Sequence, residues 1–196
     1  MDENASRSAI KQLAEELLVR HGYRGLRFAD IAAQMGITRA NIHYHFGTKA
    51  ELIDEVLADY VTATLDSLRT VWASESGSFA DSLMRMLVFS RQRYDRFNAP
   101  GEPVRPWSLI SRLRQDQELL SDAGRARLGQ FSTELHNVFV AALSRIAKSG
   151  EIRDDVGAAT TLLVAIADSA APITLAEGGF AGLEAAYAAL AKLALK

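Results

Sequence analysis

The stretch from Phe28 to Leu52 reads FADIAAQMGITRANIHYHFGTKAEL, and it decides how the first part of this chain folds. Four apolar residues recur in it at helical spacing and so share one helix face: Phe28, Ile31, Ala32 and Met35. Gly36 then ends the helix, because glycine enters the left-handed conformation without a Cβ penalty. The stretch therefore opens with a short helix that stops at a tight turn.

A second short helix follows the turn. Ile37 is an apolar residue that would be buried at the turn, and Thr38 is a good N-cap residue. The new helix would carry four polar side chains outward: Arg39, Asn41, His43 and Tyr44. Two helices joined by a glycine turn, with a polar second helix, are typical of a helix-turn-helix reader of double-stranded DNA.

A third signal lies directly after the second helix. Thr48 and Glu51 match the capping box, in which each side chain accepts a hydrogen bond from the other residue's backbone N–H. Lys49 would then sit in the first turn of a helix, where the dipole disfavours a cation. A DNA phosphate at this helix start would explain the lysine.

Composition limits the remaining possibilities. Apolar residues make up 48% and charged residues 23% of the 196 residues, as in an ordinary soluble globular protein. There is no cysteine, which excludes disulfides and thiolate metal sites and fits a reducing cytosol, so we expect a cytoplasmic protein. The apolar run from Val156 to Leu175 is interrupted by Asp168 and Pro172, which favours a buried or interface helix over a membrane span.

The net charge of −2 does not by itself indicate a nucleic-acid binder. The first 50 residues hold seven basic and five acidic residues, so they carry +2 and the remainder carries −4. This asymmetry is modest. The DNA-binding prediction therefore depends on the motif and on where individual charges lie.

Apolar residues keep helical spacing along the rest of the chain, and no strand-like alternation or internal repeat of useful length occurs. We expect an all-α protein of about nine helices. Residues 1–47 would form a three-helix DNA-binding head, and residues 48–196 a larger helical domain, which the family resemblance described below implies to be for effector binding and dimerisation. A long helix from residue 48 towards Trp72 would link the two.

The segment from Phe28 to Leu52 resembles the DNA-binding head of the TetR family of transcriptional regulators. An apolar second helix, a Gly-apolar-Ser/Thr turn, an aromatic-rich recognition helix ending in Phe46, and Lys49 at the next helix start occur in the family's order. The family often has Tyr where His43 stands, so a phosphate contact there would depend on pH. Past the first quarter of the chain, only the number and lengths of the helices agree with the family.

The resemblance implies roles for particular residues. Thr38 and Tyr44 would touch phosphates, Arg39 and Asn41 would face base edges, and Lys49 would contact the DNA backbone. The connection before the first helix of the motif adds Arg24 or Arg27 near a phosphate, although a solvated loop explains these arginines equally well. The DNA-binding residues we predict are Thr38, Arg39, Ala40, Asn41, His43, Tyr44, Lys49 and Arg27.

The resemblance also implies a homodimer formed by the last two long helices. Two recognition helices about one DNA turn or more apart would read a palindromic operator. The predicted seam consists of Leu162, Leu163, Ile166, Ala167, Ala170, Tyr187 and Leu190, with Leu193 beyond it. For any single one of these residues, a place in the core of one chain is an equally good interpretation.

A ligand-responsive repressor needs a second site for a small-molecule effector. The middle helices offer these residues for a pocket: Trp72, Met86, Phe89, Trp107, Phe131, His136 and Phe139. A plain core role is the competing interpretation. Residues 79–149 hold eleven basic and seven acidic residues, which favours an anionic or neutral effector. Binding would shift the long helix and change the separation of the two heads.

Two other classes of protein compete with a transcriptional regulator. An enzyme is disfavoured because the sequence holds no phosphate loop, nucleophile elbow or paired-carboxylate motif. His43-x-His45 points to different faces of a helix, so we expect no metal, no cofactor and no catalytic residue. The remaining alternative is a helical ligand- or protein-interaction module without DNA binding.

Overall fold

The computed structural model describes residues 3–73, 78–152 and 155–195. Ten α-helices and one 3-10 turn make up the regular structure of these ranges, and their one extended pairing is an isolated bridge between Ile152 and Leu195. The all-α fold class is confirmed, with one helix more than expected. The chain divides into two units: one comprises the chain up to Thr62 with Ser108–Gly129, the other Ala63–Trp107 with the chain from Gln130 onward.

Three helices form the head of the first unit: α1 (Glu3–Gly25), α2 (Phe28–Met35) and α3 (Arg39–Phe46). As expected, Gly36 ends α2 in the left-handed conformation, and Gly22, with a φ of 70°, interrupts α1 near its end. Fully buried residues from all three helices and the next one form a common core: Ile10, Leu18, Ile31, Ile42 and Leu52. The head is thus held by apolar contacts between short helices with sharp ends.

The first unit also contains α6 (Leu109–Gln115) and the 3-10 turn Gln117–Leu119, and α6 packs against α1. We expected one helix from Trp107 to about Glu118. The structure starts it later, at the Ser108 cap, and ends it at Asp116, which leads into the 3-10 turn. The Ser121 hydroxyl then donates to the Asp54 carboxylate at 2.7 Å, which ties the start of the following helix to the preceding long one.

Two long helices contribute to both units: α4 (Lys49–Trp72) and α7 (Asp122–Ala147). Both run without proline, so each backbone ladder is uninterrupted. In the second unit they meet through two arginines. Arg69 pairs with Glu134 at 3.1 Å, and Arg145 donates to the Trp72 carbonyl.

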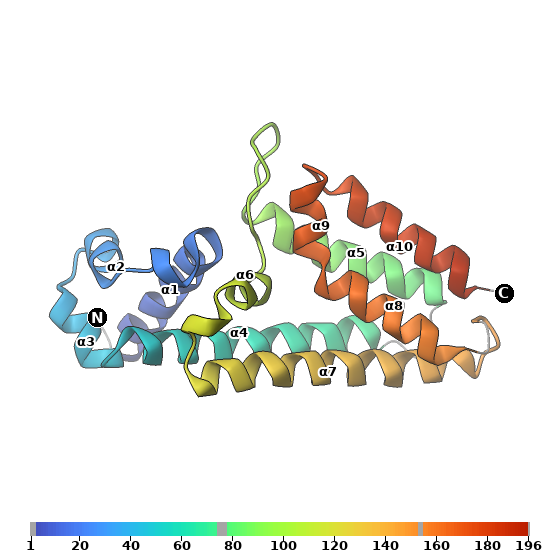
Figure 1. Cartoon of the computed structure of the whole chain (residues 1–196), viewed down its shortest axis with the longest axis horizontal. Coiled ribbons are helices and arrows are strands. Elements are labelled where there is room, and N and C mark those ends of the chain that lie inside the picture. Colours follow the sequence, from blue (N-terminus) through green and yellow to red (C-terminus); the bar gives the residue numbers. More distant parts are fainter. Residues whose placement is uncertain (1–2, 74–77, 153–154, 196) are drawn as a thin grey trace. The chain divides into compact units, whose positions relative to one another are not determined.

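The second unit adds α5 (Phe79–Asp95), α8 (Val156–Asp168), α9 (Ala170–Ala176) and α10 (Ala181–Ala194), and α10 packs against the other three (Figure 1). Sequence alone predicted one helix through Ile166 to Pro172. Instead, the chain breaks at Ser169, and α8 and α9 are bent by 59° to each other. Pro172 falls in the first turn of α9, where a missing N–H costs no helical hydrogen bond.

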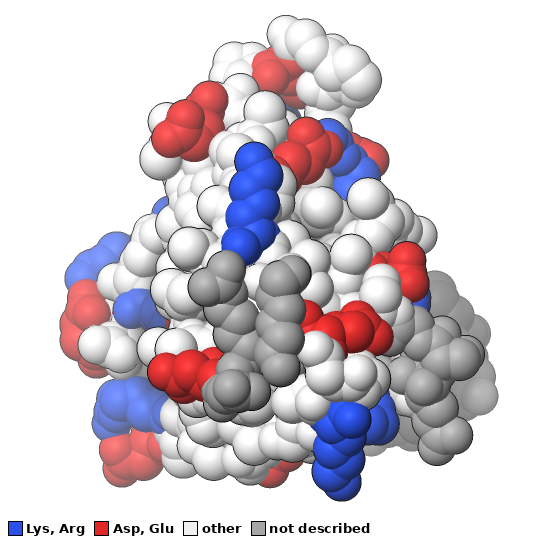
Figure 2. Space-filling model, turned by 90° about the vertical axis from the view of Figure 1, so that its right-hand side faces the viewer, with Lys and Arg blue, Asp and Glu red and all other residues white. Residues whose placement is uncertain are grey.

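Two surface properties of the described residues matter for function. No single helix among them is long and apolar enough to span a bilayer; the bent pair α8 and α9 passes that test only together. The end of the second unit that faces the viewer in Figure 2 shows basic and acidic side chains interspersed among uncharged ones. That face therefore offers no broad basic field for a polyanion.

Candidate nucleic-acid interface

Helix α3 turns one face inward and the other to solvent. Ile42 and Phe46 are buried in the head. The opposite side exposes four side chains in succession around the helix: Arg39, Ala40, His43 and Tyr44. Tyr44 is 75% exposed, which is unusual for a tyrosine in a domain that has an apolar core to receive it. An anchored helix with an exposed polar and aromatic row has the form of a DNA reading head.

The start of α3 is fixed by its cap. The Thr38 hydroxyl oxygen accepts a hydrogen bond from the Asn41 backbone N–H at 3.2 Å. A hydroxyl that accepts in this way still has its own proton to donate. Thr38 is exposed, so its side chain can cap the helix and donate to a phosphate oxygen at once.

The two predicted base readers differ in their freedom. Arg39 is exposed and makes no hydrogen bond or ion pair with any described residue. Asn41 is half-buried, and its Oδ1 atom is enclosed without a hydrogen-bond partner among the described residues. A two-bond contact from Asn41 to adenine therefore requires its side chain to rotate outward, whereas Arg39 is ready as it stands.

His43 is held in place by two contacts. Its ring packs edge-on against Phe28, with 4.8 Å between the ring centroids, and its Nδ1 atom lies 2.7 Å from the Gly47 carbonyl oxygen. A carbonyl only accepts, so Nδ1 carries the hydrogen and Nε2 of the neutral ring is an acceptor. A hydrogen bond from Nε2 to a phosphate therefore needs the protonated ring.

Lys49 is less exposed than a simple phosphate contact would suggest. Its ammonium lies 4.6 Å from the centre of the Tyr23 ring, within the range of a cation–π interaction. Burial lowers the pKa of Lys49, and the charge of Asp116 partly opposes this. Asp116 also accepts a hydrogen bond from the Tyr23 backbone N–H at 2.8 Å. Lys49 is thus positioned by α1 and by the end of α6.

The capping box at the start of α4 forms as expected. The Thr48 N–H donates to Glu51 Oε2 at 2.7 Å, and the Glu51 N–H donates to the Thr48 hydroxyl at 3.2 Å. The hydrogen bonds from Thr48 lower the pKa of the Glu51 carboxyl. Gly47 has a φ of 62°, and a Cβ there would come within 2.5 Å of Glu51 Oε2. Glycine is therefore needed at this corner for both conformation and space.

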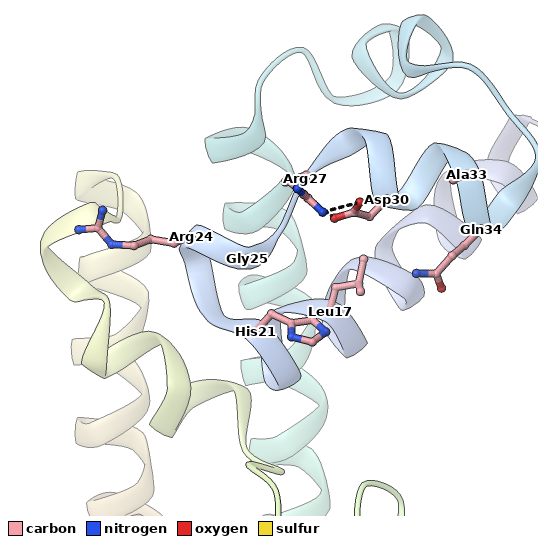
Figure 3. Close-up of a pocket in the computed structure, with 8 residues that line it drawn as sticks. All are labelled: Leu17, His21, Arg24, Gly25, Arg27, Asp30, Ala33 and Gln34. Carbon is pink, nitrogen blue, oxygen red and sulfur yellow. Dashed lines mark hydrogen bonds and ion pairs between the residues drawn. The ribbon is translucent and has the colours of Figure 1, made fainter.

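Arg27 lies beside a surface depression of the head (Figure 3). Its guanidinium pairs with Asp30 through contacts of 2.8 and 3.0 Å, and that hydrogen-bonded pair raises the pKa of Arg27. Arg24 points away from this pair in Figure 3. The depression has a volume of about 530 Å³. Its lining consists of Leu17, His21, Arg24, Gly25, Arg27, Asp30, Ala33 and Gln34. A phosphate at Arg27 would have to compete with Asp30.

Sequence reasoning missed the role of Arg7. Its guanidinium lies 4.4 Å from the centre of the Phe46 ring, and it donates to the His45 carbonyl and to the Glu55 carboxylate. Arg7 therefore pins the end of α3 to α1 and α4. Nothing local marks it, because Arg7 and its partners are 38 and 48 residues apart in sequence.

The second unit holds a small cavity that contains four of the seven predicted pocket residues: Met86, Phe89, Trp107 and Phe131. Its volume is about 50 Å³. Trp72 and Phe139 lie elsewhere in the same unit, as an edge-on pair with 5.3 Å between ring centroids. His136 is exposed and does not line the cavity. Trp72 also lines a separate open pocket of about 370 Å³ between α4 and α7, so the structure does not bring the predicted pocket residues together in one site.

The residues predicted for the dimer interface differ in their exposure to solvent. Leu163, Tyr187 and Leu190 are buried within the chain, as is Ala170, because α10 packs against α8 and α9. Ile166 and Ala167 are half-buried. Leu162 is 42% exposed and Leu193 is 63% exposed. Of the predicted seam, Leu162 and Leu193 are the large apolar side chains available to a partner.

The comparisons with known proteins agree with this geometry. Residues 10–56 match the family model described as "Bacterial regulatory proteins, tetR family". The HTH-type transcriptional repressor KstR2 of Rhodococcus jostii is 22% identical over 156 residues, which cover 79% of this chain and 71% of that protein. The HTH-type transcriptional regulator TtgR of Pseudomonas putida is 39% identical over 85 residues, or 42% of this chain and 39% of TtgR.

Solved structures show the same fold over the whole chain. A TetR-family transcriptional regulator from Agrobacterium tumefaciens superposes with a TM-score of 0.86, at 18% identity and with 100% of both chains covered. A TetR transcriptional regulator from Chloroflexus aurantiacus gives 0.79, at 20% identity, covering 99% of this chain and 98% of that one. The head, its match and this fold define a helix-turn-helix transcriptional regulator. Residues 10–56 are thus similar to the DNA-binding head of TetR-family regulators, and the chain as a whole has the fold of solved TetR-family proteins.

Proposed function

We propose that this regulator is a repressor that binds a palindromic DNA operator as a homodimer and is released by a small molecule. The observation that carries the DNA-binding part is the exposed row on α3, held from behind by Ile42, Phe46 and Arg7. A relative with a matching head, KstR2, is described as a transcriptional repressor.

The proposed contacts follow from the freedom of each side chain. Arg39 would read a guanine edge, and Asn41 an adenine edge after its side chain turns outward. Ala40 would let the helix approach the groove floor closely. Four further side chains would hold the phosphates and position the helix: Thr38, His43, Tyr44 and Lys49, with Arg27 at the edge of the head.

Selection of bound sequences from random double-stranded DNA by the purified protein tests this function. We expect enrichment of a palindrome whose half-sites lie about one helical turn, or a multiple of it, apart. An enriched single half-site would contradict the dimeric reading. A protein that enriches no sequence would contradict the regulator assignment altogether.

The proposed dimer uses the outer surface of α8 and α10. Leu162 and Leu193 are exposed there, so we assign them to the seam in place of the buried Leu163 and Leu190. Replacement of Leu162 by aspartate should dissociate the dimer in analytical ultracentrifugation. The exposed Val88 of α5 offers a matched control, since Val88→Asp should leave the dimer intact. Equal effects of both changes would contradict this seam.

The proposed effector site is the cavity of the second unit. A transcriptional regulator from Saccharomonospora viridis with this fold, at 21% identity, has been solved in complex with choline, so that protein takes a small molecule. We propose that residues 1–47 form the DNA-binding domain and residues 48–196 the effector and dimerisation domain. Helix α4 begins at the phosphate-contacting Lys49 and contributes Thr64 and Leu68 to the cavity lining.

Because α4 joins the two proposed sites without a break, a ligand that favours one arrangement of the second unit would move the head. The ligand can do so only by binding the two arrangements with different affinity. Operator affinity measured with and without bound ligand tests this, and identical affinities would rule out induction.

A further inference from the structure

The last turn of α1 is held by a side chain from another helix of the same unit. Gly22 breaks α1 with a φ of 70°, and Tyr23 follows the break. The Tyr23 backbone N–H donates at 2.8 Å to Oδ2 of Asp116, the residue at which α6 ends. Asp116 therefore caps this turn from a position 93 residues further along the chain.

The Asp116 carboxylate has little room to turn away from this contact. A Cβ at Gly22 would lie 2.5 Å from Asp116 Oδ2 and 2.9 Å from Arg112 Nε, so only glycine leaves space for the approach. Asp116 makes no ion pair with a described residue. Arg112 Nε, although it also approaches Gly22, has no hydrogen-bond partner within the described ranges. The fold thus fixes a carboxylate charge beside α1.

Tyr23 connects this charge to the lysine that we expect to contact DNA. The Lys49 ammonium lies 4.6 Å from the centre of the Tyr23 ring, in a cation–π contact. Lys49, Tyr23 and Asp116 are all half-buried, so their charges are screened less than charges in open solvent. Burial lowers the pKa of Lys49, and the negative charge of Asp116 opposes that change. Asp116 therefore stabilises the ammonium where it lies.

The hydrogen bond to Tyr23 does not by itself require an aspartate. An asparagine or serine oxygen would accept from the same N–H. The carboxylate adds a negative charge, and it adds this charge close to a helix start where we expect a DNA phosphate. A carboxylate and a phosphate attract the same ammonium, so the two groups oppose each other at Lys49.

We propose that Asp116 competes with the DNA phosphate for Lys49 and so lowers the affinity of the head for every duplex. In the free protein, Asp116 holds the turn that carries the Tyr23 ring, and its charge favours the ammonium over that ring. In the complex, the ammonium exchanges this place for the phosphate. Asp116 is thus a positioning residue that acts on DNA binding through Lys49. The inference rests on the proposed phosphate contact of Lys49.

Asp116→Asn tests the proposal, because asparagine can still accept from the Tyr23 N–H but carries no charge. The variant should bind a duplex about 3- to 5-fold more tightly than the parent, as for the loss of one partly exposed charge pair. Fluorescence anisotropy with a labelled mixed-sequence duplex at low salt, where screening is weakest, measures this. Unchanged or weaker binding by a variant that melts like the parent would overturn the proposal.

A second variant acts on the same lysine without touching Asp116. Tyr23→Leu removes the aromatic ring beneath the ammonium and keeps the backbone N–H that Asp116 accepts from. It should also strengthen duplex binding, because the free lysine loses a competing contact. Weaker binding would show that the ring prepares Lys49 for DNA, which would overturn the proposed competition.

A double-mutant cycle separates an effect through Lys49 from a general effect of charge. In a Lys49→Gln protein, Asp116→Asn should change the affinity by less than about 2-fold, because no ammonium remains to be released. Glu118→Gln is the matched control, since Glu118 is exposed in the 3-10 turn after Asp116 and loses the same charge. An equal gain from Asp116→Asn in both backgrounds, or from Glu118→Gln, would overturn the proposal.

The outcome is separable from the proposed function. If Lys49→Gln leaves duplex binding unchanged, the proposed phosphate contact is wrong and this inference is wrong with it. If Lys49→Gln weakens binding but Asp116→Asn has no effect, the phosphate contact stands and only the role of Asp116 is lost.

Discussion

Arg39 on α3 and Thr64 on α4 both lack a partner within the described chain, yet the two environments give this opposite meanings. Arg39 is surrounded by solvent, so its guanidinium is hydrated and an absent partner costs little. Thr64 is enclosed, so its hydroxyl has neither water nor protein to bond to.

The two environments imply different sources of binding free energy at Arg39 and at Thr64. DNA at Arg39 replaces water by base edges, and the benefit is mainly discrimination between sequences. A ligand at Thr64 removes an existing penalty, so part of its benefit is stability of the second unit. Substitution of an exposed residue of the head should therefore have little effect on the free energy of unfolding. Substitution of a buried residue of the second unit should lower it.

The largest expected effect comes from an aromatic residue in each region. Phe139 is fully buried in the second unit, and Phe139→Ala should lower the free energy of unfolding by about 3–5 kcal/mol, through lost transfer energy and a new cavity. Tyr44→Ala, at the exposed aromatic of α3, should stay within about 0.5 kcal/mol. Chemical denaturation measures both, and similar losses would contradict the contrast between the regions.

A smaller effect is expected for the base reader. Arg39→Ala should relax discrimination at one base pair by about 1–3 kcal/mol and leave stability unchanged. Competition binding between the selected operator and single-base variants measures this. Arg20→Ala, at an exposed arginine of α1, serves as the control and should alter no base preference. An Arg39→Ala protein with unchanged preference at every position would remove Arg39 from the reading role.

Lys49 should affect affinity without affecting sequence preference. Lys49→Gln should weaken binding to all duplexes and reduce the slope of log affinity against log salt by about one, as for the loss of one phosphate contact. Titrations at several salt concentrations measure the slope. If the slope stays the same, the Lys49 ammonium remains over the Tyr23 ring in the complex and makes no phosphate contact.

The smallest effect concerns the capping boxes, one in each unit. Hydrogen bonds from Thr48 lower the pKa of Glu51, and hydrogen bonds from Ser78 lower that of Asp81. A lowered folded pKa adds stability that is present above the unfolded value of about 4 and is lost as the pH falls through the folded value. Melting temperatures should therefore fall slightly more steeply in acid for the parent than for Glu51→Gln or Asp81→Asn. If the melting temperatures of the parent and the variants fall equally with pH, neither capping box contributes the expected stability.

Local rules were sufficient for the head. Gly36, Thr38, and the pair Thr48 and Glu51 act on backbone groups within four residues of themselves, so their helix ends are encoded where they occur. The exposed row of α3 follows from the same local spacing. By contrast, the break at Ser169 was missed, because an apolar run continues through it and Pro172 fits either a helix end or a first turn.

By itself, the sequence determined an all-α chain with a helix-turn-helix head, a capped α4 and Arg39 on the outward face of α3, because each of these depends on short-range periodicity and hydrogen bonding. Only the tertiary structure decided that Arg7 pins α3 and that Lys49 lies over Tyr23. It also decided that Leu163, Tyr187 and Leu190 are interior, and that the buried Thr64 hydroxyl has no hydrogen-bond partner among the described residues. These features depend on which helices, distant in sequence, pack against one another. The helical period of apolar residues shows which face of a helix is buried, but it does not show which other helix covers that face.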